Sequence, residues 1–356
     1  MKKSFQEAVE LLKLMIKTPS PSGQETEVIS IIEFFLTKKN IKFSRKKNNI
    51  WAINKYYDKE KPTILLNSHV DTVKPNKDYS FDPFDPVIQS DMLFGLGSND
   101  AGGAVVSLLM CFEQLYGIRD SKYNICLALT AEEEISGSNG LELILPELGE
   151  LEFAIIGEPT QMKMAIAERG LIVLDCLVKG KAGHAAQNTG ENAIYKAIDD
   201  INWFKSYKFN KLSEYLGPVK MSVTMLRAGI QHNIVPEKCK FVVDVRSNEQ
   251  YSNVEILNII KSKVACDVIP RSTRLNPSFI SPDHPAVKVG INLGLETYAS
   301  PTSSDQCILS IPSIKIGPGD SNRSHAANEF IRLDEIKEGI KKYCDYIDLI
   351  CRHTMA

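Results

Sequence analysis

Imidazole and carboxylate side chains recur in this sequence at the ends of runs that predict buried strands and at the start of one predicted helix. They are His69, Asp71, Asp100, Glu132, Glu133, Glu134, Glu158 and His325. The run TILLN leads into the first two of these residues, and NICLALT leads into the three consecutive glutamates. Functional groups collect beyond the C-terminal ends of strands in an α/β sheet, because the loops there vary while the strands hold position. We therefore expect these side chains to meet in one crevice.

The chemistry of this set favours a metal site. A lone histidine at a strand end is usually a hydrogen-bonding residue, EEE is usually a solvated acidic loop, and Asp100 is most simply an N-cap. Together, however, these loops would place uncompensated negative charge in one crevice unless a cation neutralised it. Imidazole and carboxylate without thiolate suit zinc, cobalt, manganese or non-haem iron. Because a single catalytic zinc takes three protein ligands, a set of this size favours two metals.

The elements that must position these residues alternate between strand and helix patterns. Two amphipathic stretches, near 4–17 and 24–38, predict helices, and a Gly/Ala-rich helix is expected over about 101–116 with another near 138–146. Between them lie β-type runs such as PTILLNSH, NICLALT and FAIIGE. This alternation predicts an α/β fold, with a mostly parallel sheet that carries helices on both faces.

From about Gly170 the order of elements changes to β-α-β-β-α-β, which is the ferredoxin-like α+β plan. The α/β pattern resumes after Pro277. We therefore expect a discontinuous metal-binding catalytic domain over 1–167 and 276–356. A lid or dimerisation domain over 168–275 would be inserted into it.

Composition narrows the class of protein. The formal net charge of −2 gives no basic field for a phosphate backbone, so nucleic acid is not an expected partner. No apolar run approaches the ~18 residues of a membrane span, and the N-terminal stretch predicts an amphipathic helix rather than a signal peptide. Eight cysteines without a CxxC pair predict reduced core residues. We expect a cytoplasmic protein that does not bind membranes.

Several motifs together resemble one known family. HVDT, GLGSNDAGGA, TAEEEISGS, IGEPT, GKAGHAA, HNIVP and a closing SH are similar to the dinuclear zinc aminoacylase and carboxypeptidase family, which includes acetylornithine deacetylase, succinyl-diaminopimelate desuccinylase and carboxypeptidase G. The motifs occur in the family's order and cover nearly the whole chain. IGEPT and the short length look most like the acetylornithine deacetylase branch.

The resemblance implies a ligand set for two divalent metal ions, most simply zinc, with cobalt or manganese as alternatives. His69 and Glu158 would hold one ion, Glu134 and His325 the other, and Asp100 would bridge them. Asp71 would accept the free N–H of His69. Glu133 would be the general base that takes a proton from the attacking water and passes it to the departing amine.

Spacing alone leaves the register of the three glutamates open. The family's usual motif has aspartate where this chain has Glu132, so the roles of Glu133 and Glu134 rest on alignment.

The resemblance also implies substrate contacts. His184 would stabilise the oxyanion, commonly in the active site of the other subunit, which predicts a homodimer; a surface histidine is the alternative. Asn233 and Arg246 match substrate-binding positions, although Arg246 could equally form a structural ion pair. Gly317 lies in a GPG turn where backbone would approach substrate. Asp305 is not expected to be a ligand, and His232, His284 and His353 are expected to be ordinary histidines.

The preferred reading is a metal-dependent amidohydrolase that acts on a small N-acylated amino acid. N-acetyl- or N-succinyl-ornithine, or the matching citrulline, would place it in arginine biosynthesis. One alternative keeps the chemistry but changes the substrate to succinyl-diaminopimelate or a small dipeptide. Another alternative is a catalytically inactive relative that binds an amino-acid derivative or a partner. The sequence leaves the acyl group and the native metal open.

Overall fold

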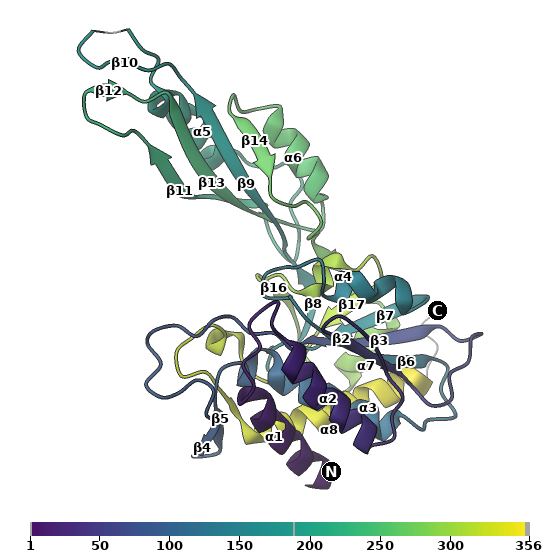
Figure 1. Cartoon of the computed structure of the whole chain (residues 1–356). Helices are drawn as coiled ribbons and strands as arrows, with labels where there is room; N and C mark the ends of the chain where they lie inside the picture. The colour runs from purple at the N-terminus through teal and green to yellow at the C-terminus, as the bar shows by residue number, and fades with distance from the viewer. Residues whose placement is uncertain (1, 188, 353–356) are drawn as a thin grey trace. The chain divides into compact units, whose positions relative to one another are not determined.

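The computed structural model describes residues 2–187 and 189–352, which form two compact units (Figure 1). The first unit runs to Ile166 and resumes over Ile280–Tyr298 and from Ser304 onwards. The second unit comprises Ala167–Phe279 and Ala299–Ser303. Each unit has a hydrophobic core of its own.

The first unit is built on a twisted sheet whose centre is parallel. Its strands follow the order β1-β2-β6-β3-β7-β17-β8, with bounds Ser44–Lys46, Asn49–Ile53, Asn124–Thr130, Thr63–His69, Leu151–Ile156, Ser313–Lys315 and Met164–Glu168. The four central strands, β6, β3, β7 and β17, are mutually parallel, whereas β1, β2 and β8 pair antiparallel at the two sides. The predicted mostly parallel sheet is thus confirmed for the strands that carry the predicted site.

Alternation along each central strand divides its side chains between two cores, because successive residues of a strand point to opposite faces. On β3, Ile64 and Leu66 join the larger core, while Leu65 joins a smaller one on the other face. Both faces of the sheet are therefore covered, which explains why these strands read as continuous apolar runs.

The larger core lies beneath five helices, and the smaller one beneath short segments. The five helices are α1 (Lys2–Ile16), α2 (Thr26–Lys38), α3 (Gly103–Leu115), α7 (Pro285–Asn292) and α8 (Leu333–Arg352). The other face is covered by α4 (Leu141–Ile144) and by apolar residues of the segment near 308–311. The helix expected near 138–146 is thus a single turn, because Gly140 precedes it and Pro146 interrupts it. A small sheet has the order β18-β5-β4 (Phe330–Arg332, Met92–Phe94, Val87–Gln89), and β16 (Thr297–Ser300) pairs with β8 of the large sheet.

The second unit has the ferredoxin-like arrangement. Its sheet follows the order β11-β13-β9-β14, with bounds Lys220–Ala228, Lys238–Ser247, Gly170–Lys179 and Asp267–Pro270, and every pair is antiparallel. Helices α5 (Ala193–Ser206) and α6 (Asn253–Lys261) pack on one face. Two features were not expected: a short ribbon of β10 (Gly183–His184) and β12 (Ile234–Val235), and β15 (Ser278–Phe279), which pairs with Glu168 and Ala167.

All eight cysteines are free thiols, and six of them are buried. Among the described helices, none combines the length and the apolar character that crossing a membrane requires.

Candidate metal centre

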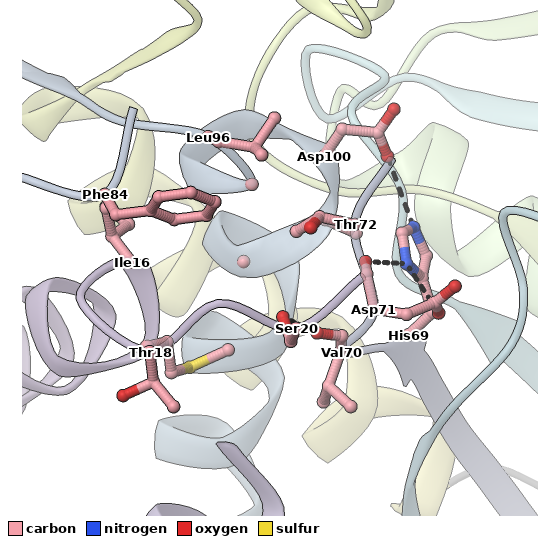
Figure 2. Close-up of a pocket in the computed structure, with 14 residues that line it drawn as sticks. Ile16, Thr18, Ser20, His69, Val70, Asp71, Thr72, Phe84, Leu96 and Asp100 are labelled. Carbon is pink, nitrogen blue, oxygen red and sulfur yellow. Dashed lines mark hydrogen bonds and ion pairs between the residues drawn. The ribbon is translucent and has the colours of Figure 1, made fainter. Parts of the chain in front are cut away.

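His69, the last residue of β3, is the centre of the cluster that the sequence predicts (Figure 2). Its ring is buried between two carboxylates. Nε2 lies 3.2 Å from Oδ1 of Asp100 and 3.7 Å from Oε1 of Glu158. Nδ1 faces Asp71, 3.0 Å from its backbone carbonyl oxygen and 3.4 Å from its carboxylate. One ring nitrogen is thus held by the protein while the other points to the candidate ligands.

Asp100 lies between the two histidines. Its second oxygen, Oδ2, is 3.6 Å from Nε2 of His325, so each oxygen of one carboxylate faces a different imidazole. Asp100 belongs to an irregular turn, Ser98–Gly102, whose φ of −118° and ψ of 98° at this residue are not helical, and no N-cap bond from its side chain is found. The simple N-cap explanation is therefore wrong.

His325 reaches the cluster from the loop that follows β17. Its Nε2 lies 2.9 Å from Oε2 of Glu134, in the loop that follows β6. The φ of His325 is 60°, a left-handed conformation that is uncommon for residues other than glycine and concentrates at functional sites.

Asp71 organises the glutamate loop as well as the histidine. Its Oδ1 accepts the backbone N–H of Glu133 at 3.0 Å, and its Oδ2 accepts that of Glu134 at 3.1 Å. The hydroxyl of Ser22 donates to Oδ2 at 2.7 Å. Burial opposes ionisation of Asp71, but the hydrogen bond with His69 and the charge of that ring, followed by the bonds from Ser22 and Glu134, outweigh burial and lower the pKa of Asp71.

The three glutamates have different partners in the structure. The carboxylate of Glu132 accepts hydrogen bonds from the backbone and side-chain N–H groups of Asn139, within its own loop. Glu133 and Glu134, in contrast, each fall into a group of side chains that could hold a metal ion. One group is His69, Asp100 and Glu134, the other is His69, Glu133 and Glu158, and within each the ligand atoms lie within 4.8 Å of one another. This arrangement favours the register that the alignment gives.

Burial and crowding perturb the acids of the cluster. Burial, reinforced by neighbouring carboxylates, raises the pKa of Glu158 to about 8 and that of Glu133 well above its usual range, although His69 opposes both shifts. Burial likewise opposes ionisation of Asp100, but hydrogen bonding to His69 prevails and lowers the pKa of Asp100.

The two histidines respond in the opposite sense. Burial would lower the pKa of His69, but hydrogen bonds with Asp100 and Asp71 outweigh it and raise the pKa well above the usual range. The hydrogen bond with Glu134 raises the pKa of His325 to about 9. Several acids thus compete for the proton of each imidazole, as expected where negative charge exceeds positive charge.

The donor set fits divalent metal ions. Five carboxylates (Asp71, Asp100, Glu133, Glu134 and Glu158) and two imidazoles converge, and all of these residues except His325 are buried or half-buried. The buried cation Lys315 also acts on Glu158, but one lysine does not balance the set. Oxygen and imidazole donors without thiolate match zinc, cobalt or manganese, and charge balance calls for cations in this place.

Two residues that sequence reasoning missed hold the Asp100 turn. Glu329, 2% exposed, accepts backbone N–H groups of this turn, and Asn99, fully buried, bonds Asp320 of the His325 loop through both side-chain atoms. Burial and the charge of Asp100 raise the pKa of Glu329 to about 8. The sequence gives only a faint signal for Glu329, a glutamate four residues after His325, because its partners are backbone groups.

The predicted substrate contacts other than Gly317 lie in the second unit. His184 lies on β10 and Asn233 directly precedes β12, and the N–H of Ala185 donates to the carbonyl of Asn233 at 3.0 Å. Arg246, on β13, makes two bonds to Asp244, at 2.8 and 3.1 Å. The ion pair that the sequence offered as an alternative is therefore present.

Gly317, in the first unit, has a packing explanation. A Cβ at this position would lie 2.5 Å from the backbone oxygen of Glu158 and 2.8 Å from the hydroxyl of Tyr343. Asp305 accepts a hydrogen bond from Thr130 at 3.2 Å. His284 caps α7 and stacks on Phe153, His232 is exposed, and His353 lies outside the described residues.

Fold and site together define a metallohydrolase: a catalytic unit that gathers acids and imidazoles at the carboxyl edge of a parallel sheet, together with a ferredoxin-like second unit. The model of Peptidase family M20/M25/M40 matches residues 65–349, and the chain belongs to this family. It is accordingly an amidohydrolase of the dinuclear metal type, which confirms the family resemblance.

Curated relatives match over nearly the full length. A LysW-lysine/LysW-ornithine hydrolase of Sulfurisphaera tokodaii is 27% identical, covering 96% of this chain and 95% of the relative. A succinyl-diaminopimelate desuccinylase of Psychromonas ingrahamii is 24% identical, covering 90% and 91%.

Solved structures show the same fold. An M20 family metallo-carboxypeptidase of Sulfolobus solfataricus superposes with a TM-score of 0.76 at 18% identity, covering 96% of this chain and 99% of that one. A tripeptidase of Staphylococcus aureus gives a TM-score of 0.78 at 19% identity, covering 98% and 99%.

Proposed function

We propose that this protein removes the acyl group from a small N-acylated amino acid, with zinc as its native metal. The observation that carries the proposal is the position of Asp100, whose two oxygens face Nε2 of His69 and Nε2 of His325. Glu158 and Glu134 lie beside these two histidines. His69, Asp100 and Glu158 would hold one ion, and Asp100, Glu134 and His325 the other.

The bound ions would polarise the acyl carbonyl and make water more acidic. Glu133 supplies the base: its carboxylate lies in the same group as His69 and Glu158, and the bond from its backbone N–H to Asp71 fixes its loop. It would accept the proton of the attacking water and return it to the nitrogen of the leaving amine. Asp71 would position both the base and a metal ligand, because it binds the backbone N–H of Glu133 and also contacts the imidazole of His69.

The hydrogen bond that His184 makes supports its proposed role as an oxyanion donor. Its Nδ1 accepts the backbone N–H of Ala186 at 3.2 Å, so the proton of the neutral ring resides on Nε2. An exposed Nε2–H group can donate to an oxygen that develops negative charge. Asn233 lies beside it, with an amide oxygen that is buried and accepts no hydrogen bond from the described residues.

The distance between His184 and Arg246 supports a homodimer. Arg246 pairs with Leu171 at one end of the β9–β13 ladder, and Lys238 pairs with Lys179 at the other. Eight residues of strand separate Lys238 from Arg246, roughly 27 Å at ~3.4 Å per residue, and the ribbon that carries His184 lies beyond the Lys238 end (Figure 1). One small substrate cannot contact both residues of one chain, so we propose that a second copy provides His184.

The preferred substrate is N-acetyl- or N-succinyl-ornithine, or the matching citrulline, as part of arginine biosynthesis in the cytoplasm. Ornithine appears in the name of the Sulfurisphaera tokodaii relative. Arg246 supports a substrate with a free carboxylate, because its planar guanidinium can form two parallel hydrogen bonds with one. Succinyl-diaminopimelate is the second candidate substrate, since the similar proteins from Psychromonas ingrahamii and Wolbachia pipientis are named succinyl-diaminopimelate desuccinylase.

The test is amine release from a matched panel. It would contain the N-acetyl and N-succinyl forms of ornithine, citrulline and diaminopimelate, together with a simple dipeptide, first with zinc or cobalt and then with a chelator. Turnover of an acyl-ornithine or acyl-citrulline that the chelator abolishes supports the proposal and settles the acyl group. Turnover of succinyl-diaminopimelate alone, or of the dipeptide alone, replaces it with the corresponding alternative.

A further inference from the structure

The turn that carries Asp100 is held by a single buried carboxylate from a distant part of the chain. Oε1 of Glu329 accepts the backbone N–H of Asn99 at 2.8 Å and that of Asp100 at 2.9 Å. Its Oε2 accepts the backbone N–H of Gly97 at 3.1 Å. These groups lie at the start of the Ser98–Gly102 turn, where backbone N–H groups have no partner within the turn. Glu329 therefore acts as a cap that is supplied across more than two hundred residues of sequence.

The strand pairing that follows Glu329 fixes where this carboxylate lies. β18 begins at Phe330 and pairs with β5, and the backbone oxygen of Glu329 accepts the N–H of Gly95 at 3.0 Å. The backbone of Glu329 is thus anchored to Gly95, just before the turn, while its side chain binds the N–H groups of Gly97, Asn99 and Asp100. Loss of the carboxylate would leave these buried backbone N–H groups without a partner, which is costly in a protein interior.

The same segment carries both His325 and Glu329. A second connection reinforces the link, because Asn99 donates to the carbonyl oxygen of Asp320 at 3.1 Å and accepts the N–H of Asp320 at 2.9 Å. The turn also packs closely against Thr72, which limits its movement. A Cβ at Gly97, whose φ is 73°, would lie only 2.5 Å from Cγ2 of Thr72. The positions of Asp100 and His325 are therefore coupled through these contacts.

We propose that Glu329 is a positioning residue of the metal centre: it fixes the turn that carries Asp100, so that the carboxylate of Asp100 can bind both ions. It touches neither substrate nor the reacting atoms, and it acts through the backbone of Asp100. The inference rests on the ligand set proposed above.

The experiment compares the full-length protein with Glu329→Gln and Glu329→Ala, each loaded with cobalt(II). Binding would be followed by competition with a chromophoric chelator, and the ligand geometry by the visible absorption spectrum of the bound cobalt. Glutamine retains an oxygen for Asn99 and Asp100 but presents an N–H₂ group to the N–H of Gly97, whereas alanine loses all three bonds. We expect affinity for at least one ion to fall about 10–100-fold in the alanine variant and less in the glutamine variant, with an altered cobalt spectrum in both.

Asp200→Ala is the matched control. Asp200 is also a buried carboxylate that accepts two backbone N–H groups, those of Ala265 and Cys266, but it lies in the second unit. Its loss should leave cobalt affinity and spectrum unchanged. A folded Glu329 variant with wild-type affinity and spectrum overturns the inference, and if the alanine variant does not fold, the glutamine variant decides. Wild-type protein that binds fewer than two ions would instead refute the ligand set.

Discussion

His325 and Glu134 are separated by 191 residues in the sequence, yet Nε2 of one lies 2.9 Å from Oε2 of the other. Glu134 follows β6, and His325 follows β17, two strands that are not neighbours in the sheet but run in the same direction. The contact therefore arises from the parallel arrangement of the sheet, which brings the carboxyl ends of its strands to one edge. It also decides which of three consecutive glutamates faces the second histidine.

The first prediction concerns that register. Glu133→Gln should retain two metal ions and lower kcat by about 100-fold or more, because the base is lost while the ligands remain. Metal content measured by elemental analysis and kcat measured on the substrate found by the panel would check it.

Glu132→Gln is the control for this prediction. The carboxylate of Glu132 bonds only Asn139 among the described residues, so its substitution should change stability more than turnover. The assignment of the base would be reversed if Glu133→Gln remained active. It would also be reversed if Glu132→Gln kept its stability but lost turnover.

Much of the site could be predicted because it follows from strand ends. His69 ends a parallel strand, and Glu134, Glu158 and His325 lie in loops that follow parallel strands. The rule that predicts their position needs only the pattern of apolar runs. Asp100 joined the predicted cluster as an aspartate at a predicted helix start, where an N-cap is the simplest explanation, and its bridging role came only from the family resemblance. The structure shows instead an irregular turn at this residue.

The contacts that sequence reasoning missed are mostly bonds to the backbone. Glu329 accepts three N–H groups, and Asp71 accepts those of Glu133 and Glu134. No residue type identifies such a bond in advance, since every residue except proline offers the same N–H. The β10–β12 ribbon was not predicted for another reason: each strand has only two residues, too few to show an alternation of apolar and polar side chains.

The second prediction concerns the dimer. Mixing inactive His184→Ala protein with inactive Glu133→Ala protein should restore activity, because a hybrid pairs an intact catalytic unit of one chain with an intact lid of the other. Random exchange makes half of the dimers hybrid with one competent site each, so recovery should approach about a quarter of the wild-type rate. Mass spectrometry would establish subunit exchange, and exchange without recovery would exclude a role for His184 across the dimer.

The third prediction separates binding from structure at Arg246. If this side chain leaves Asp244 to bind the substrate carboxylate, Arg246→Ala should raise KM about tenfold or more with a smaller effect on kcat. Arg271→Ala is the matched control, because Arg271 makes the same kind of two-bond pair with Asp175 on the same sheet. Equal, small effects of the two substitutions on KM would leave Arg246 as a structural residue.

The fourth prediction is a pH dependence of the metal-free protein. The bond to Glu134 raises the pKa of His325 from 6.5 to about 9, so its contribution to stability is full below pH 6.5 and is lost as the pH rises through 9. Burial raises the pKa of Glu158 from 4.5 to about 8, so the folded protein holds a proton that the unfolded chain releases, and stability again falls as the pH rises. Asp71 and Asp100, whose pKa values are lowered, stay ionised in this range.

His325 and Glu158 thus act in the same direction, as do His69, Glu133 and Glu329, whose pKa values are also raised. The melting temperature of chelator-treated protein should therefore fall by several degrees between about pH 6 and about pH 9. Metal binding needs ionised carboxylates and neutral imidazoles, so the loaded protein should show the reverse trend in affinity and a larger stabilisation at the higher pH. Differential scanning calorimetry with and without chelator would measure both. Glu158→Gln should flatten the slope of the metal-free protein, and a slope that is absent in the wild type would mean that these acids do not share the buried site.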